Sequence, residues 1–291
     1  MSPMTVVIQD CRASLQRRNS SASTLDSDTL DLQLFFADRD KASAQVTFGE
    51  VDRFIARHYQ PGLAPATINR RWSALKPFFA FRLDRQVVSG NPVQPSQVLR
   101  RARTLPRALA QEQVDQLFAQ MPHPLDRALF LLMLRWGLRV SEVARLKLRD
   151  MDWAQQAVLV EQGKGRQDRR VYLSADAVAS VRACLQQRPR GVPAEAVFWN
   201  QKRPHHPLSV KAIQKKRERD AKAAGLVASC HRLRQTFASN LLEQGAEIVS
   251  IRELLGHASL ASSERDAKGS NQKLKQVDVK TMRKVLQQSK V

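Results

Sequence analysis

The sequence contains few tyrosines and cysteines and no long apolar stretch. Only 2 tyrosines and 3 cysteines occur among its 291 residues. The cysteines, Cys11, Cys184 and Cys230, form no Cys-x-x-Cys pair. The sequence therefore supports neither a disulfide framework nor a zinc ribbon, and we expect reduced thiols in a cytoplasmic protein. No run of about 18 apolar residues exists, which excludes a transmembrane helix. The first ten residues also lack the basic region of a secretory signal.

Acidic side chains are scarce relative to basic ones. The chain has 27 Asp plus Glu against 48 Lys plus Arg, which gives a formal net charge of +21. Residues 101–291 carry +17 of this excess and residues 1–100 only +4. This imbalance requires a polyanionic partner, and nucleic acid is the first candidate. Because 43% of the residues are hydrophobic, wholesale disorder is excluded and folded cores are expected.

A break in the sequence separates two candidate domains. Residues 91–95 contain two prolines, and a basic stretch follows at 100–103. Prolines beside a run of charge are typical of a linker. We predict one domain over residues 1–98 and another over 99–291. The alternative is a single domain with a long internal loop.

The first segment has the apolar spacing of helices. The pattern predicts helices over 23–39, 48–59 and 67–83. Pro77 lies inside the last of these and should kink or split it. The basic residues on the polar side of that helix suggest a DNA clamp, and the alternative is that this side is an ordinary solvated surface. Its basic residues are Arg70, Arg71 and Lys76.

The second segment is predicted to be mostly helical with one β-hairpin. An apolar run over 124–136 predicts a buried helix, and Ser141 is the expected N-cap of the next helix. Strand-like residues at 158–160 and 170–173 flank a turn-rich stretch and predict the hairpin. Further helices are expected over 176–187, 210–224, 231–244 and 248–255. The predicted fold class is mainly α with a small β-hairpin sheet, an α+β arrangement.

Five basic side chains could converge on one phosphodiester. Arginine forks neutralise phosphate oxygens, and His or Lys can transfer the proton of an attacking or leaving oxygen, so this set suits phosphoryl transfer without a metal. The spacing also fits non-catalytic alternatives, namely a His-x-x-Arg pair on the surface and an ordinary Gly-Lys-Gly turn. A Walker loop is excluded and no metal-ligand spacing is evident. The five are Arg139, Lys164, His231, Arg234 and His257.

The motifs around these residues resemble those of the tyrosine recombinase (phage-integrase, Xer-like) family, in the same order and spacing. The resemblance covers nearly the whole chain and implies a helical core-binding domain followed by a catalytic domain. The two domains of the family form a C-shaped clamp on DNA. The matching stretches are 65–71 with 73–75 in the first domain, 137–143 for the first arginine box, 163–165 with 169–171 for the hairpin lysine motif, 231–238 for the second box and 254–260 for the third.

The resemblance implies roles for individual residues. Arg139 and Arg234 would hold the scissile phosphate, with Glu142 supporting Arg139. Lys164 would protonate the leaving 5′ oxygen, and the histidines His231 and His257 would act in acid–base support and in orienting the phosphate. The family uses a tyrosine nucleophile that forms a 3′-phosphotyrosine link, with no metal and no cofactor. Its subunits exchange a C-terminal helix within a tetramer on short paired DNA sites.

The chain departs from the family pattern at the nucleophile. The family tyrosine lies nine residues after the third-box histidine, and that position is Asp266. Neither Tyr59 nor Tyr172 matches it. Two further acids, Asp28 and Asp278, fall on apolar helix faces, where an unpaired acid is costly. They stand either where aromatic residues have been replaced or at exposed rims of short helices.

Two classes of function follow. One is a site-specific recombinase of a mobile element or chromosome, nucleoid-associated and acting with copies of itself or a partner recombinase. The other is a DNA-binding protein derived from a recombinase that cannot cut. A regulator of another family is a distant third, since it would not need the arginine boxes. Base readout is expected from 67–83 and from the helix over 210–224, whose basic residues are Lys211, Lys215, Lys216 and Arg217.

Overall fold

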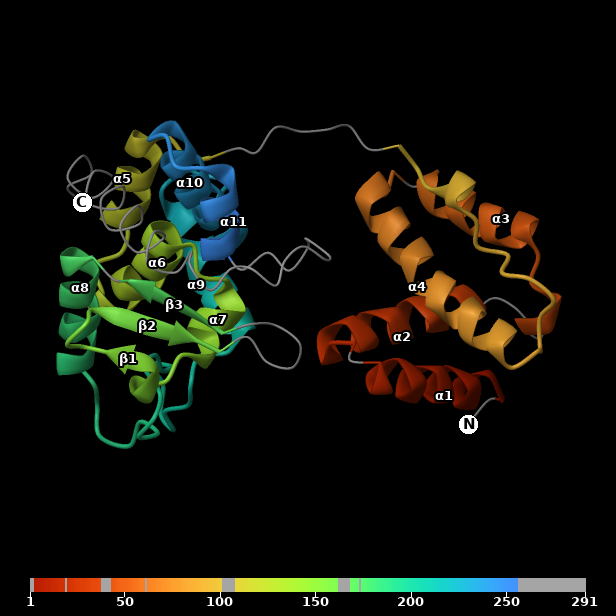
Figure 1. Ribbon diagram of the computed structural model, residues 1–291, viewed down its shortest axis with the longest axis horizontal. Coiled ribbons are helices and arrows are strands. Elements are labelled where there is room, and N and C mark those ends of the chain that lie inside the picture. The colour runs from red at the N-terminus through yellow and green to blue at the C-terminus, as the bar shows by residue number, and fades with distance from the viewer. Residues whose placement is uncertain are drawn as a thin grey trace. The chain divides into compact units, whose positions relative to one another are not determined.

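The structure is a computed structural model that describes residues 3–18, 20–37, 43–60, 62–100, 108–161, 168–172 and 174–255. Four residues of interest, Lys164, His257, Asp266 and Asp278, lie outside the described residues. The chain divides into two compact units, residues 1–104 and 105–291, each with its own hydrophobic core (Figure 1). Within the described ranges, none of the helices combines the length and apolar character needed to cross a membrane.

In the part of the first unit that the structure describes, the α-helices are α1 (Pro3–Arg17), α2 (Ala22–Phe36), α3 (Phe48–Tyr59) and α4 (Pro65–Asp84). Short 3-10 helices occur at Ser43–Gln45 and Pro95–Gln97. Helices α1, α3 and α2 all pack against α4. Phenylalanines fill the core, with the ring of Phe35 edge-on to those of Phe36 and Phe54 at centroid distances of 4.9 and 5.0 Å. The three predicted helices are confirmed, whereas α1 was not anticipated.

Pro77 was expected to kink or split its helix, and the part of this prediction that concerns a split is wrong. Helix α4 runs without interruption from Pro65 to Asp84 with Pro77 inside it. A proline in a helix interior costs about 3 kcal/mol. Residues on either side of it, among them Leu75, Phe78 and Phe79, are fully buried, and each buried side chain of this size contributes roughly 1.5–3 kcal/mol. Packing therefore outweighs the local cost of the proline.

Two acids of α2, Asp28 and Asp31, interact with Arg70 of α4. Asp31 is buried, and its carboxylate accepts hydrogen bonds from both Nη groups of Arg70, one of them at 2.9 Å. Asp28 is half-buried. Burial and the charge of Asp31 raise the pKa of Asp28, and Arg70 opposes this shift. Asp28 therefore does not stand at an exposed rim, and Arg70 serves as the counter-ion of a buried carboxylate.

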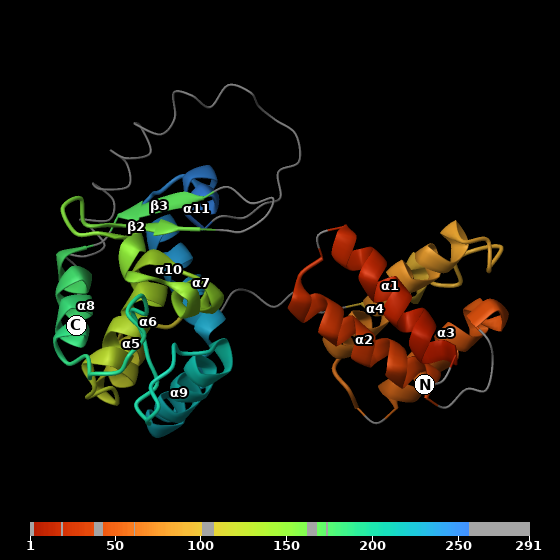
Figure 2. The same ribbon diagram turned by 90° about the horizontal axis from the view of Figure 1, so that it is seen from below.

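The second unit surrounds the buried helix α6 (Pro124–Trp136), which packs against α8 (Ala175–Gln186) and α10 (Cys230–Glu243) (Figures 1 and 2). The predicted hairpin is confirmed as β2 (Ala157–Val160) paired antiparallel with β3 (Arg169–Tyr172), with Val158 opposite Val171. The remaining elements are α5 (Gln111–Ala119), α7 (Val140–Arg145), a 3-10 helix (Leu148–Asp150), β1 (Met151–Asp152), α9 (Val210–Ala223) and α11 (Ile248–Leu255). Helix α5 and strand β1, which pairs with β2, were not anticipated.

Gly137 ends α6 in a conformation that only glycine adopts easily. Its φ is +59°, and a Cβ placed on it would lie 2.5 Å from Phe237 Cδ1 and 2.7 Å from Leu255 Cδ2. The chain thus turns out of α6 in close contact with α10 and α11. This turn brings the segment that follows Gly137 against the other two helices.

Gly137→Ala is expected to lower the free energy of unfolding by about 2–5 kcal/mol. A left-handed conformation costs an L-residue roughly 1–2 kcal/mol, and overpacking a core adds typically about 1–3 kcal/mol. Gly225→Ala is the matched control, because its φ is +67° but nothing lies within 4 Å of an added Cβ. Urea denaturation of both variants measures the difference. Equal losses would show that Phe237 and Leu255 move aside without cost.

Candidate active site

The candidate site contains Glu142, whose carboxylate caps the N-terminus of α7. Its Oε2 accepts a hydrogen bond from the backbone N–H of Arg139 at 2.7 Å, and Arg139 has the extended backbone of an N-cap residue, with φ −70° and ψ 147°. The expectation that Ser141 caps this helix is therefore wrong. The helix begins two residues earlier because the Glu142 carboxylate accepts from the backbone N–H of the N-cap residue, which is the glutamate half of a capping box.

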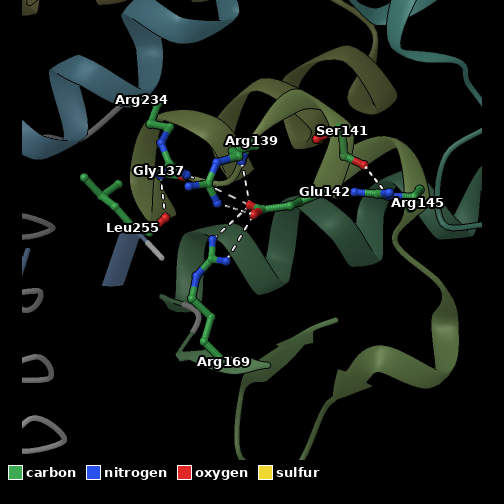
Figure 3. A network of polar contacts seen from close by, with 8 residues as sticks. All are labelled: Gly137, Arg139, Ser141, Glu142, Arg145, Arg169, Arg234 and Leu255. Carbon is green, nitrogen blue, oxygen red and sulfur yellow. Dashed lines mark hydrogen bonds and ion pairs between the residues drawn. The ribbon is translucent and has the colours of Figure 1, made fainter. Parts of the chain in front are cut away.

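Three arginine side chains surround the same carboxylate (Figure 3). Arg139 Nη1 donates to Glu142 Oε1 at 2.8 Å. Arg169 binds both oxygens, with Nη1 3.1 Å from Oε1 and Nη2 2.9 Å from Oε2. Arg234 Nη1 lies 4.0 Å from Oε2. Three guanidinium groups that converge on one carboxylate form a dense set of charged donors, and such a set suits the binding of a further anion.

Burial sets the electrostatics of the cluster. The side chains of Arg234 and Glu142 are each 5% exposed, that of Arg169 is 11% exposed and that of Arg139 is 26% exposed. Burial, followed by the charge of Arg139, lowers the pKa of Arg234 to about 10, so it remains charged at neutral pH. Burial alone would raise the pKa of Glu142, but hydrogen bonds from Arg169 and Arg139 hold it below its ordinary value. Arg139 is thus the most accessible charge of an otherwise buried set.

Arg234 also joins three parts of the chain through backbone oxygens. Its Nη1 donates to the carbonyl of Gly137 and its Nη2 to the carbonyl of Leu255 (Figure 3). Gly137 opens the segment of the first arginine box, and Leu255 directly precedes Gly256-His257 of the third. One buried guanidinium therefore holds together the start of the first box, the second box and Leu255 of the third box.

The other predicted site residues are distributed differently. His231 is exposed in the first turn of α10, whereas Arg234 in the next turn is buried. Lys164, His257 and Asp266 lie outside the described residues, so of the five basic residues expected to converge, the structure brings together Arg139 and Arg234. Within the described ranges, no three His, Cys, Asp or Glu side chains are grouped so that they could hold a metal ion.

The residues predicted to contact DNA fall into two groups. Lys76, Lys211 and Lys215 are exposed. The others have partners or are partly covered. Lys216 Nζ lies 2.8 Å from Oδ1 of the buried Asp126, Arg217 donates to the carbonyl of Ala228, Arg70 binds Asp31, and Arg71 is partly buried.

Arg169 is a site residue that sequence reasoning missed. Successive residues of a strand point to opposite faces. Arg169 therefore shares a face with the buried Val171, and Arg170 points the other way. An arginine on the buried face of a short strand requires a counter-ion. That alternation was the available signal, although it does not reveal Glu142 as the partner.

Comparison with known proteins gives the family. A model of the phage integrase family matches residues 107–266, and one of the phage integrase N-terminal SAM-like domain matches residues 12–86. The tyrosine recombinase XerD of Lacticaseibacillus casei is 34% identical over 265 residues, covering 86% of this chain and 89% of that protein. The tyrosine recombinase XerA of Thermococcus kodakarensis is 33% identical over 215 residues, covering 73% of this chain and 74% of that protein. This chain belongs to the phage integrase family of tyrosine recombinases.

Solved structures share its fold. The Tn1549 transposon integrase in complex with circular intermediate DNA aligns with a TM-score of 0.71 at 19% identity, over 89% of this chain and 96% of that one. A lambda integrase dimer bound to a COC′ core site aligns with a TM-score of 0.70 at 19% identity, over 89% of this chain and 98% of that one. The mainly helical fold with its small antiparallel sheet is therefore the tyrosine recombinase fold.

Proposed function

We propose that the chain binds duplex DNA at short paired sites as a site-specific recombinase and that its arginine cluster holds the scissile phosphate. The observation that carries this proposal is the convergence of Arg139 and Arg234 on Glu142, which brings two guanidinium groups to one carboxylate. The family membership and the net charge of +21 support DNA as the polyanion. The Tn1549 and lambda integrase structures that share this fold are complexes with DNA, which agrees with this assignment.

In the reaction proposed, a tyrosine oxygen attacks phosphorus and forms a 3′-phosphotyrosyl bond while the bond to the 5′ oxygen breaks. Arg139 and Arg234 neutralise the charge that builds up on the non-bridging oxygens. Lys164 gives the proton that the leaving 5′ oxygen takes up. His231 and His257 assist in proton transfer and in orienting the phosphate. Neither metal nor cofactor is required for this sequence of events.

The chain as it stands carries Asp266 where the tyrosine is expected, and we propose that it does not cut DNA. It would then recognise its site and hold the phosphate without forming the covalent intermediate. The alternative is that a non-catalytic DNA-binding role is the protein's function, as an occupant of the site or a partner to an active recombinase. Covalent trapping on a nicked duplex, with footprinting to locate the site, separates the two roles.

The two units take different parts in this proposal. The helical N-terminal unit is the core-binding domain, and the C-terminal unit carries the catalytic cluster. Copies of the chain assemble on DNA, as a tetramer in the complete complex. We place the protein in the cytoplasm of the cell that holds its target, on the nucleoid, with a transposon, phage or chromosome as the element it serves.

Binding to duplex DNA is expected to weaken by about 0.9 log units per log unit of salt for each phosphate neutralised. Lys211→Gln and Lys215→Gln should each reduce the total slope of log affinity against log salt concentration by about 1, because both lysines are exposed. Lys216→Gln is the matched control in the same helix. Its ion pair with the buried Asp126 predicts a loss of stability rather than of salt slope. Fluorescence anisotropy at several salt concentrations gives the slopes, and a flat response would contradict DNA binding.

A further inference from the structure

The position of Arg169 is explained neither by the roles that the family resemblance gives to other residues nor by the capping of α7. It lies on β3, five residues after Lys164, and its two Nη groups bind the two oxygens of Glu142 end-on at 3.1 and 2.9 Å. That carboxylate at the same time holds Arg139 through its backbone N–H and its Nη1. Figure 3 shows the Arg169 and Arg139 side chains meeting at Glu142 from different elements.

This geometry fixes the direction of the Glu142 side chain. Arg139 bonds to the two carboxylate oxygens through two separate groups, its backbone N–H and its Nη1, and this leaves the carboxylate some freedom about its terminal torsion, which is a broad one. The planar fork of Arg169 removes that freedom, because a bidentate pair requires both oxygens to lie in the plane of the guanidinium. With both Nη groups engaged at Glu142 and only 11% of its side chain exposed, Arg169 is poorly placed to present its fork to a ligand.

We infer that Arg169 is a positioning residue: by orienting the Glu142 carboxylate it sets the guanidinium of Arg139 for the phosphate and fixes β3 to α7. The inference rests on the proposed function, since it assigns Arg169 to the same phosphate site. In Figure 1, α7 lies beside the end of the hairpin where β3 begins, as the Arg169–Glu142 contact requires. The contact thus holds β3, which follows the Lys164 segment in the sequence, in a fixed position relative to α7, whose N-cap residue is Arg139.

Arg170 provides a matched control within the same strand. It is the adjacent arginine, half-exposed, and its Nη2 pairs with Asp152 Oδ2 at 3.1 Å. Arg169→Gln and Arg170→Gln therefore remove the same charge from neighbouring positions. Only the first variant removes a contact to Glu142.

The first readout uses the chain without DNA. Side-chain ¹⁵N NMR of Arg139, assigned with Arg139→Lys, should show separate Nη proton signals because its guanidinium is held by Glu142. We expect these signals to be lost in Arg169→Gln and kept in Arg170→Gln. Unchanged Arg139 signals in Arg169→Gln, or equal loss in both variants, would overturn the inference.

The second readout is the rate of covalent adduct formation in an Asp266→Tyr background at saturating nicked DNA. Arg169→Gln should slow this rate by roughly 10²-fold, as small misplacements of a reacting group do, with the half-saturating DNA concentration changed less than about threefold. The same substitution in a Glu142→Gln background should add little, because coupled residues are not additive. Full additivity would overturn the inference. If Asp266→Tyr with Arg169 intact gives no adduct, the proposed function fails, and the NMR result alone decides the role of Arg169.

Discussion

The Asp266→Tyr variant is expected to form a covalent 3′ adduct with a nicked half-site of the cognate DNA, and the unmodified chain is expected to form none. The family motif places its nucleophile nine residues after the third-box histidine, and we expect that position to be residue 266 of this chain. A carboxylate can attack phosphorus, but attack requires reacting atoms within about 3–3.5 Å and in line. The aspartate side chain is several bonds shorter than that of tyrosine. Its charge is also attracted to Arg139 and Arg234, where it would compete with the phosphate.

A denaturing gel of protein with labelled half-site measures the adduct. Asp266→Phe is the matched control, because it restores the aromatic ring without the hydroxyl and should give no band. A covalent band from the unmodified chain would refute the proposed loss of cleavage. Absence of a band from a folded Asp266→Tyr variant that binds its site would refute the transfer of family roles to these residues.

Glu142→Ala is expected to lower the free energy of unfolding by about 3–5 kcal/mol, which is the usual loss when one partner of a buried ion pair is removed. The substitution leaves Arg169 and Arg234 buried without their carboxylate and removes the cap of α7. Since single domains are stable by only about 5–15 kcal/mol, the variant should unfold at a much lower urea concentration. Glu142→Gln keeps an acceptor for the cap and should lose less.

The loss of unfolding free energy in Glu142→Ala should become smaller as the pH falls. The pKa of Glu142 is lowered in the folded chain, so its stabilising contribution is present above the ordinary glutamate pKa of about 4.3. It is lost as pH falls through the lower folded value. The difference between the unmodified chain and Glu142→Ala should therefore be full at neutral pH and shrink in acid. Glu195→Ala is the control, because its pair with Lys147 is exposed and little change is expected. A pH-independent loss would argue against the ionised pair.

Local sequence patterns predicted the helices and strands whose apolar residues recur at a regular spacing. Helix α3 has the predicted bounds, and the pairing of β2 with β3 follows from two β-branched runs around a turn. Helix α1 was missed although Met4, Ile8, Cys11 and Leu15 follow helical spacing and pack on the core of the first unit. Pro77 misled the prediction because local propensity gave way to packing in the core.

The candidate site was predictable only in part, because Glu142 beside Arg139 was expected whereas Arg169 was missed. The motifs pointed to Arg139 and Arg234, and the structure brings both to Glu142. The partner of Arg169 lies 27 residues away, and the partner of Lys216, which looked like a DNA contact, lies 90 residues away. Periodicity within a helix or strand contains no information about contacts over such separations. Charge counts alone therefore overestimate how many basic side chains are available to a partner.

The hydrogen bonds of Arg234 also bear on the order in which the domain can acquire its activity. Its two carbonyl acceptors lie 97 residues before it and 21 residues after it along the chain. Contacts of such separation close large loops and form late in folding, once the intervening helices have docked. A partly folded or still growing polypeptide would carry the positive charge but not the assembled phosphate pocket. Specific recognition of the scissile phosphate would then arise only with the completed domain.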